Sequence, residues 1–300
     1  MTPGDEERSS GKRFERVLVL GASGLLGGAL VTELARRGIA CFAPTRREMD
    51  LAETGAIGRA LEAAAPDAVL NAAAFTDVTR AETPECRDIV LRVNRDAPSA
   101  LSRACGDAGV PFVLFSTDYV FDGSRHVPYV EEDPPAPLQV YGLSKLEAER
   151  AVLEAHPRAL IVRTSTLFGP GRHRRPTFVD TVLRMARQMP VVGIVESPVA
   201  SPTYTPDLAA AALDLLEAGA TGVVHAVNEG AASRLELARA VVEGAGLSGI
   251  VEVRVQPEPP GGALWPRFSA LSGARFARIA GRPLRAWRDA LSEYLEIPRP

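Results

Sequence analysis

Short apolar runs and amphipathic segments alternate along the first half of the chain. The apolar runs predict buried strands at 17–20, 39–43, 67–72, 111–115 and 159–163. Segments with helical periodicity lie between and after them, at about 24–37, 53–64, 84–108 and 139–155, and Pro98 interrupts the third. This alternation predicts an α/β fold, a doubly wound parallel sheet with right-handed crossovers.

Beyond residue 164 the alternation becomes irregular. Helices are expected near 178–188, 206–218 and 234–243, and short strands near 191–192, 223–226 and 251–255. We therefore expect a disordered tail over 1–14 and a Rossmann domain over 15–165, to which the chain returns near 202–228. Residues 166–300 mainly form a smaller, discontinuous substrate domain in this prediction.

The first predicted strand runs into a glycine-rich turn and then a helix. Its glycines at 21, 24 and 27 have GxxGxxG spacing. The missing side chains let the backbone approach a phosphate, and the helix offers free N–H groups with a partial positive charge. A glycine turn with no ligand is the alternative. The residues interpreted as a dinucleotide-binding turn are Gly21, Ser23, Gly24, Leu25 and Leu26.

Composition and net charge limit the kinds of partner that the protein is expected to bind. The net charge is −3, which favours neither nucleic acid nor an anionic membrane as the main partner, and no apolar run is long enough to cross a bilayer. The three cysteines lack metal-binding spacing, so we expect no metal and interpret them as thiols in a reducing cytoplasm.

Two later motifs carry candidate chemistry. The strand before Thr117 ends at the sheet edge where open α/β proteins bind ligands. Tyr141 and Lys145 are four residues apart on a predicted helix and therefore share one face. A nearby ammonium lowers the pKa of a phenol from ~10 towards that of a general acid at neutral pH. Following a glycine turn in this order, the motifs indicate an enzyme.

These motifs lie in longer stretches that resemble a known family. They read PDAVLNAAAFT at 66–76, STDYVFDG at 116–123, VYGLSK at 140–145, RTS at 163–165 and SPTY at 201–204. The chain resembles the extended short-chain dehydrogenase/reductases, and within them the dTDP-4-dehydrorhamnose reductases, over about 17–271. The resemblance implies reduction of the 4-keto group of a nucleotide-linked, dTDP-type 4-keto-6-deoxy sugar by a nicotinamide cofactor, in the synthesis of a polysaccharide or glycosylated natural product.

The resemblance also implies roles for individual residues. Tyr141 would donate the proton, Lys145 would lower the tyrosine pKa and hold the nicotinamide ribose, and Thr117 would orient the carbonyl. The other implied cofactor contacts are Asp50, Leu51, Ala72, Ala73, Ala74, Asn94, Ser116 and Thr164. The implied substrate contacts are Thr76, Thr117, Asp118, Tyr119, Tyr141, Thr166, Thr203 and Arg267.

The loop after the second predicted strand indicates which nicotinamide is bound. It carries Arg46 and Arg47 with no acidic residue at the strand tip. An acidic residue there would bind the ribose 2′-hydroxyl, whereas an arginine accommodates a 2′-phosphate. We therefore expect NADPH, with NADH as the alternative. Two exposed arginines flanking a helix, without a ligand, would be the simpler interpretation.

Departures from the family pattern keep other functions open. Related sugar 4,6-dehydratases carry Thr-Asp-Glu at this strand end, whereas Tyr119 follows Asp118 here, which favours reduction. Thr166 replaces a tryptophan of the family, and Phe268 replaces an asparagine, so we expect a different or modified 4-keto sugar. The alternatives are a nucleotide-sugar epimerase or dehydratase and a non-catalytic dinucleotide-binding regulatory subunit. We expect a monomer or a homodimer.

Overall fold

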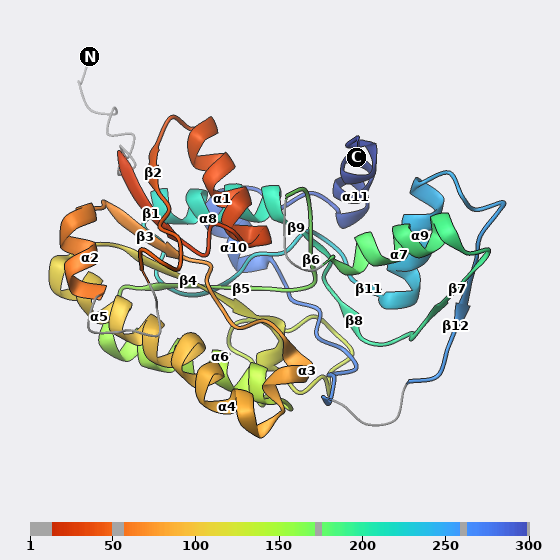
Figure 1. Ribbon diagram of the computed structural model, residues 1–300, viewed down its shortest axis with the longest axis horizontal. Helices are drawn as coiled ribbons and strands as arrows, with labels where there is room; N and C mark the ends of the chain where they lie inside the picture. Colours follow the sequence, from red (N-terminus) through yellow and green to blue (C-terminus); the bar gives the residue numbers. More distant parts are fainter. Residues whose placement is uncertain (1–13, 50–56, 172–175, 259–262, 299–300) are drawn as a thin grey trace, which may run out of the picture.

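The computed structural model describes residues 14–49, 57–171, 176–258 and 263–298 (Figure 1). Its main sheet has six parallel strands in the order β2-β1-β3-β4-β5-β10. These strands are β1 (Arg16–Leu20), β2 (Ala40–Phe42), β3 (Ala68–Asn71), β4 (Phe112–Thr117), β5 (Leu160–Thr164) and β10 (Gly222–His225). The doubly wound parallel sheet predicted from the sequence is therefore confirmed, and the late strand β10 completes it.

Helices cover both faces of this sheet, as Figure 1 shows. One face carries α1 (Leu25–Arg36), α8 (Thr205–Glu217) and α10 (Ala274–Ala280), and the other carries α2 (Ile57–Ala64), α5 (Ala97–Ala108) and α6 (Val140–Ala155). Within β1, Val17 and Val19 pack against the helices on one face of the sheet, and Leu18 and Leu20 pack against those on the other face. Alternate side chains of a strand point to opposite faces, so a continuous apolar run fits a strand covered on both sides.

The helix predicted over 84–108 is divided. It consists of α4 (Pro84–Leu91), a π-helical turn η2 (Arg92–Asp96) and α5, and a further short helix α3 (Val78–Ala81) precedes it. Proline has no N–H and cannot bond the carbonyl four residues before it. For Pro98 that residue is Asn94, and the π turn accommodates the break there.

A second apolar core lies beyond the sheet, on the right of Figure 1. It is built from α7 (Phe178–Gln188), α9 (Arg234–Gly244) and α11 (Trp287–Glu296), beside the parallel pair β7 (Val191–Ile194) and β12 (Glu252–Val255). The remaining short elements are η3 (Asp118–Val120), β6 (Leu167–Phe168), β8 (Val199–Ala200), β9 (Thr203–Tyr204) and β11 (Ala232–Ser233). Within the described ranges, no helix has the length and apolar character needed to span a membrane.

The first turn of α1 packs directly on the glycine turn before it. A Cβ built on Gly27 would lie 2.1 Å from the Gly21 carbonyl oxygen, closer than any real contact. Gly21 itself has φ +79°, the left-handed region that favours glycine. Gly28, the next residue of the helix, has room, since its Cβ would lie 3.6 Å from the nearest atom. Of these two adjacent glycines, only Gly28 can therefore be replaced by a residue with a side chain without a clash.

We predict that alanine has opposite effects at these two positions. Gly28→Ala should stabilise the fold by about 0.5–1 kcal/mol, because alanine is the better helix former. Gly27→Ala should destabilise it by about 1–3 kcal/mol, because its methyl group meets backbone rather than a movable side chain. Denaturant unfolding of both variants measures the difference, and equal effects would contradict the packing described.

Candidate active site

The carboxyl edge of the sheet opens between β1 and β3, because the chain leaves β1 for β2 on one side and returns to β3 on the other. The glycine turn lies at this point. A Cβ on Gly21 would lie 2.6 Å from the Ala73 nitrogen, so the turn contacts the segment after β3. No side chain caps α1 at Gly24, and Ser23 and Gly24 are exposed. Free N–H groups at a helix start fit the pyrophosphate of a dinucleotide.

The predicted cofactor contacts that follow β3 in the chain differ in their exposure to solvent. Ala72, Ala73 and Ala74 are partly exposed beside the glycine turn. Asn94, in contrast, is fully buried: its Oδ1 accepts from Phe75 N at 2.7 Å, and its Nδ2 donates to Ser144 Oγ at 3.0 Å. Asn94 therefore fastens the loop after β3 to helix α6, a contact no sequence motif indicates. Its predicted contact with a cofactor stays a prediction.

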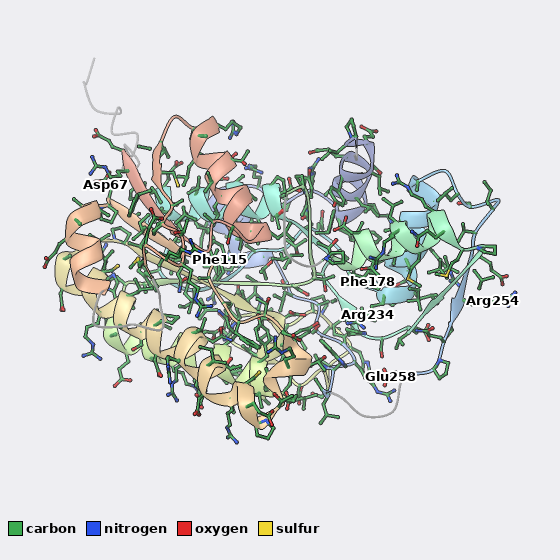
Figure 2. The ribbon with its side chains drawn as sticks, in the orientation of Figure 1. Asp67, Phe115, Phe178, Arg234, Arg254 and Glu258 are labelled. Atoms are coloured by element: carbon green, nitrogen blue, oxygen red, sulfur yellow. The ribbon has the colours of Figure 1, made fainter. Side chains whose placement is uncertain are left out.

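The structure brings Thr117, Tyr141 and Lys145 together. Thr117 ends β4, and its Oγ1 accepts from Tyr119 N at 3.2 Å. Tyr141 and Lys145 lie in the first two turns of α6. Lys145 is 2 % exposed, and its Nζ donates to the carbonyl oxygen of Phe115 at 2.6 Å, within β4 (Phe115 is labelled in Figure 2). The strand end and the helix therefore present a hydroxyl, a phenol and an ammonium in one site.

The two titrating groups of this trio are shifted by burial. Burial raises the pKa of Tyr141, the charge of Asp118 raises it further, and hydrogen bonding with Thr117 opposes both. Burial also lowers the pKa of Lys145 to about 8, against the charge of Glu149. The sequence predicted a lowered tyrosine pKa. That direction is not found here, because burial dominates at Tyr141 and the ammonium of Lys145 bonds the Phe115 carbonyl.

A buried carboxylate holds helix α6 to the sheet beneath Lys145. Glu149, one helical turn further on, accepts from Ser116 Oγ at 2.5 Å and from Arg163 Nη2 at 2.6 Å and Nε at 2.9 Å. All three side chains are at most 5 % exposed. The hydroxyl of Ser116, a predicted cofactor contact, is thus engaged with Glu149. Sequence reasoning missed this network, which joins residues of β4, β5 and α6.

Asp118 connects three distant segments. Its Oδ2 accepts from Ser165 Oγ at 2.7 Å and from Ser269 Oγ at 2.5 Å, and its Oδ1 accepts from Thr117 Oγ1 at 3.1 Å. Burial raises the pKa of Asp118 to about 6, and the hydroxyl bonds lower it in part. The described bonds thus give this predicted substrate contact a structural function as well.

The other predicted substrate contacts differ in exposure. Thr76 and Arg267 are exposed, and Thr166 is partly exposed with φ +37°, unusual for a β-branched residue. Thr203 is fully buried, and its backbone N–H donates to the Thr166 carbonyl. Tyr119 lies edge-on to the Tyr141 ring, with centroids 6.3 Å apart. Of these substrate-contact candidates, Tyr119 is placed beside Tyr141 by its ring contact, and Asp118 is placed beside Thr117 by a hydrogen bond.

The predicted cofactor-discriminating loop follows β2. Arg46 and Arg47 are exposed there, and Glu48, an acidic residue to which the sequence prediction gave no weight, accepts from Thr45 N at 2.7 Å. Asp50 and Leu51 lie outside the described residues. Thr164, at the end of β5, has a buried Oγ1 without a partner among the described residues. A buried hydroxyl of this kind fits a polar group of a bound ligand.

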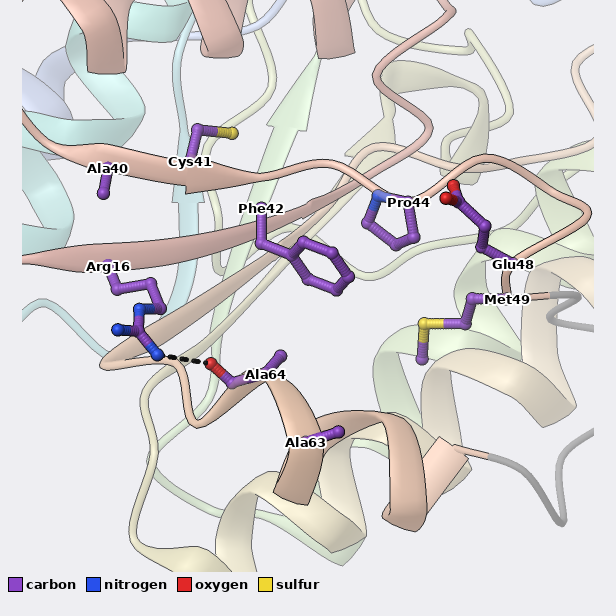
Figure 3. A pocket seen from close by; sticks show the side chains of 9 residues that line it. All are labelled: Arg16, Ala40, Cys41, Phe42, Pro44, Glu48, Met49, Ala63 and Ala64. Carbon is purple, nitrogen blue, oxygen red and sulfur yellow. Dashed lines mark hydrogen bonds between the residues drawn. The ribbon is translucent and has the colours of Figure 1, made fainter.

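A cavity of about 480 Å³ runs along the edge of β2 (Figure 3). Arg16 at one end donates to the Ala64 carbonyl, and Glu48 and Met49 lie at the other. Thr117, Tyr141 and Lys145 do not line this cavity, but Glu48 does, so one end of the cavity adjoins the predicted cofactor-discriminating loop.

An uncapped glycine turn at the switch point of a parallel sheet, on the same edge as Thr117, Tyr141 and Lys145, is the arrangement of a dinucleotide-dependent enzyme. Comparison with known proteins agrees. Residues 15–299 match the family model described as RmlD substrate binding domain. The dTDP-4-dehydrorhamnose reductase of Mycobacterium tuberculosis is 40 % identical over 297 residues, 95 % of this chain and 94 % of the relative.

Two further proteins are similar over nearly the whole chain. The dTDP-4-keto-6-deoxy-D-glucose reductase of Streptomyces niveus is 34 % identical, over 93 % of this chain and 96 % of the relative. The dTDP-4-dehydrorhamnose reductase of Bacillus anthracis, solved in complex with NADP, aligns with TM-score 0.85 and 29 % identity, covering 94 % of this chain and 99 % of that one. The chain belongs to the dTDP-4-dehydrorhamnose reductase family and is an NAD(P)H-dependent oxidoreductase.

We predict that Lys145 makes stability rise with pH. Its pKa of about 8 lies below the ordinary 10.5, so between these values the unfolded chain holds a proton that the folded chain has released, and stability increases across this window. Relative to Lys145→Met, the unfolding free energy of the wild type should rise by on the order of 2–3 kcal/mol from pH 7.5 to 10.

The chain offers a matched control for this measurement, because its only other lysine is Lys12. Denaturant unfolding at several pH values should show the same pH dependence for Lys12→Met as for the wild type. A constant difference between the wild type and Lys145→Met across the window would show that the ammonium keeps its ordinary pKa.

Proposed function

We propose that the protein reduces the 4-keto group of a dTDP-linked 4-keto-6-deoxy sugar with NADPH. The observation that carries this proposal is the convergence of Thr117, Tyr141 and Lys145 at the sheet edge that also holds the glycine turn. When bound, the nicotinamide supplies the hydride for the ketone carbon. The residues of this chain position the ketone and supply the proton.

Tyr141 is the proton donor in this scheme. Its raised pKa keeps the phenol protonated at neutral pH, and an alkoxide is a much stronger base, so the proton passes from the Tyr141 hydroxyl to the developing oxyanion. Thr117, which hydrogen-bonds in the same cluster, orients the carbonyl oxygen. Lys145, one helical turn from Tyr141, carries the positive charge that stabilises the resulting phenolate.

Two observations support NADPH as the reductant. Arg46 and Arg47 are exposed on the loop after β2, where a guanidinium can meet a ribose 2′-phosphate. The B. anthracis relative was solved with NADP. The free thiols Cys41, Cys86 and Cys105 are consistent with a reducing cytoplasm as the compartment.

The names of the relatives support the sugar class. They include reductases of dTDP-4-dehydrorhamnose and of dTDP-4-keto-6-deoxy-D-glucose, so the 4-keto-6-deoxy unit is shared and the configuration varies. Tyr119 in place of a second acid disfavours elimination, the reaction of a dehydratase. Because Thr166 stands where the family has a tryptophan, we expect a modified sugar, used in deoxysugar biosynthesis. A regulatory subunit would not need the complete trio, and an epimerase would show no net consumption of NADPH.

We predict that Tyr141→Phe abolishes reduction. NADPH oxidation with dTDP-4-dehydrorhamnose and dTDP-4-keto-6-deoxyglucose as substrates should fall about 10²- to 10⁴-fold, because the proton donor is lost, while NADPH binding persists. Tyr294→Phe is the control, since the Tyr294 hydroxyl bonds Asp180 in the second core. Turnover by Tyr141→Phe within twofold of the wild type would be evidence against this mechanism.

We further predict that Arg46→Ala and Arg47→Ala together change the cofactor preference. The KM for NADPH should rise about 10- to 100-fold with the loss of charge-assisted bonds to the 2′-phosphate, and the KM for NADH should stay within about twofold. Arg36→Ala, an exposed arginine on α1 paired with Glu33, is the control. An equal rise in the KM for NADPH and for NADH would mean that these arginines do not contact the 2′-phosphate.

A further inference from the structure

Arg234, the first residue of α9, lies between two aromatic rings. Its guanidinium carbon is 5.2 Å from the ring centroid of Trp265 and 5.9 Å from that of Phe178 (Arg234 and Phe178 are labelled in Figure 2). All three side chains are partly buried. Such stacking fixes the plane of the guanidinium, and it satisfies the charge only in part.

No carboxylate forms an ion pair with Arg234 among the described residues, although other partly buried arginines have one. Arg37 pairs with Glu33, Asp214 and Glu217, for example. A guanidinium has five N–H donors in a fixed fork, and these suit a planar or phosphate oxygen pair. The aromatic rings cover the faces of Arg234, and the Tyr119 side chain is a hydrogen-bond partner of its guanidinium, but one hydroxyl cannot match all five donors. The group is therefore suited to an external anion.

Arg234 is also connected to the catalytic tyrosine. The Trp265 ring lies edge-on to Tyr119, with centroids 5.4 Å apart, and Tyr119 lies edge-on to Tyr141 at 6.3 Å. Burial raises the pKa of Tyr119, and the charge and hydrogen bonding of Arg234 oppose that shift. The guanidinium is thus one aromatic residue removed from the proposed proton donor, on the side of the second core.

We propose that Arg234 binds the diphosphate of the nucleotide-sugar substrate. This inference rests on the proposed function. In a hexopyranose the reacting carbon, C4, and the carbon that carries the phosphate, C1, lie on opposite sides of the ring. With C4 at Tyr141, the diphosphate extends from the far side of the sugar, and the stacked guanidinium beyond Tyr119 is placed to receive it. Arg234 thereby selects a phosphorylated substrate over a free sugar.

The test compares two ligands that differ only in the diphosphate, dTDP and thymidine. Arg234→Met preserves the side-chain volume between the rings and removes the charge. It should weaken dTDP binding about 10- to 100-fold in calorimetry and leave thymidine binding within about twofold. The KM for the dTDP-sugar should rise by a similar factor, and kcat should change much less. Arg234→Lys, which keeps the charge without the fork, should fall between.

The control is Arg239→Met, an exposed arginine of the same helix, which carries the same charge change and should leave both ligands unaffected. Equal weakening of dTDP and thymidine by Arg234→Met would mean that Arg234 only shapes the site, and unchanged dTDP binding would equally overturn the proposal. Wild-type protein that does not bind dTDP would instead overturn the proposed substrate class. Thermal unfolding of each variant checks that the fold is intact.

Discussion

The active site depends on one close approach between backbones. Helix α6 begins against the turn η3, and a Cβ on Gly142 would lie only 2.1 Å from the Tyr119 carbonyl oxygen. Only glycine permits this distance, and the contact sets Tyr141 beside the end of β4 where Thr117 stands. Any larger residue would push the helix start away from the strand end and separate phenol from hydroxyl. The position of the proposed proton donor Tyr141 therefore depends on the missing side chain of Gly142.

Buried charged side chains then hold helix α6 against strands β4 and β5. Glu149 accepts from β4 and β5 through Ser116 and Arg163, and it lies one turn beyond Lys145. The lysine is thus buried in a site that opposes its charge, beside one carboxylate that favours it. Such an arrangement lowers stability and keeps an ammonium beside the proposed proton donor Tyr141. Because buried polar groups need partners, the whole network must assemble together.

Features that depend on residues close together in the sequence could be predicted, and features that depend on residues far apart could not. The apolar runs located β1, β3, β4 and β5, because a strand buried on both faces needs only local apolar residues, and they also located the edge strand β2, whose Ala40 and Phe42 are exposed. The spacing of Tyr141 and Lys145 correctly placed both on one helix. It could not reveal that the ammonium meets the Phe115 carbonyl, 30 residues away, or that burial raises the tyrosine pKa. The bond from Ser269 to Asp118 spans 151 residues and has no local signature.

The burial of Asp118 determines how its contribution to stability depends on pH. Its pKa of about 6 lies above the ordinary 3.8, so between these values the folded chain binds a proton that the unfolded chain does not. The contribution of this group to stability therefore grows as the pH falls through that window. Mild acid loosens proteins whose carboxylates are paired with cations. Here the buried Asp118 carboxyl contributes more to stability once it is protonated, because burial penalises its charge more than the hydroxyl bonds from Ser165 and Ser269 favour it.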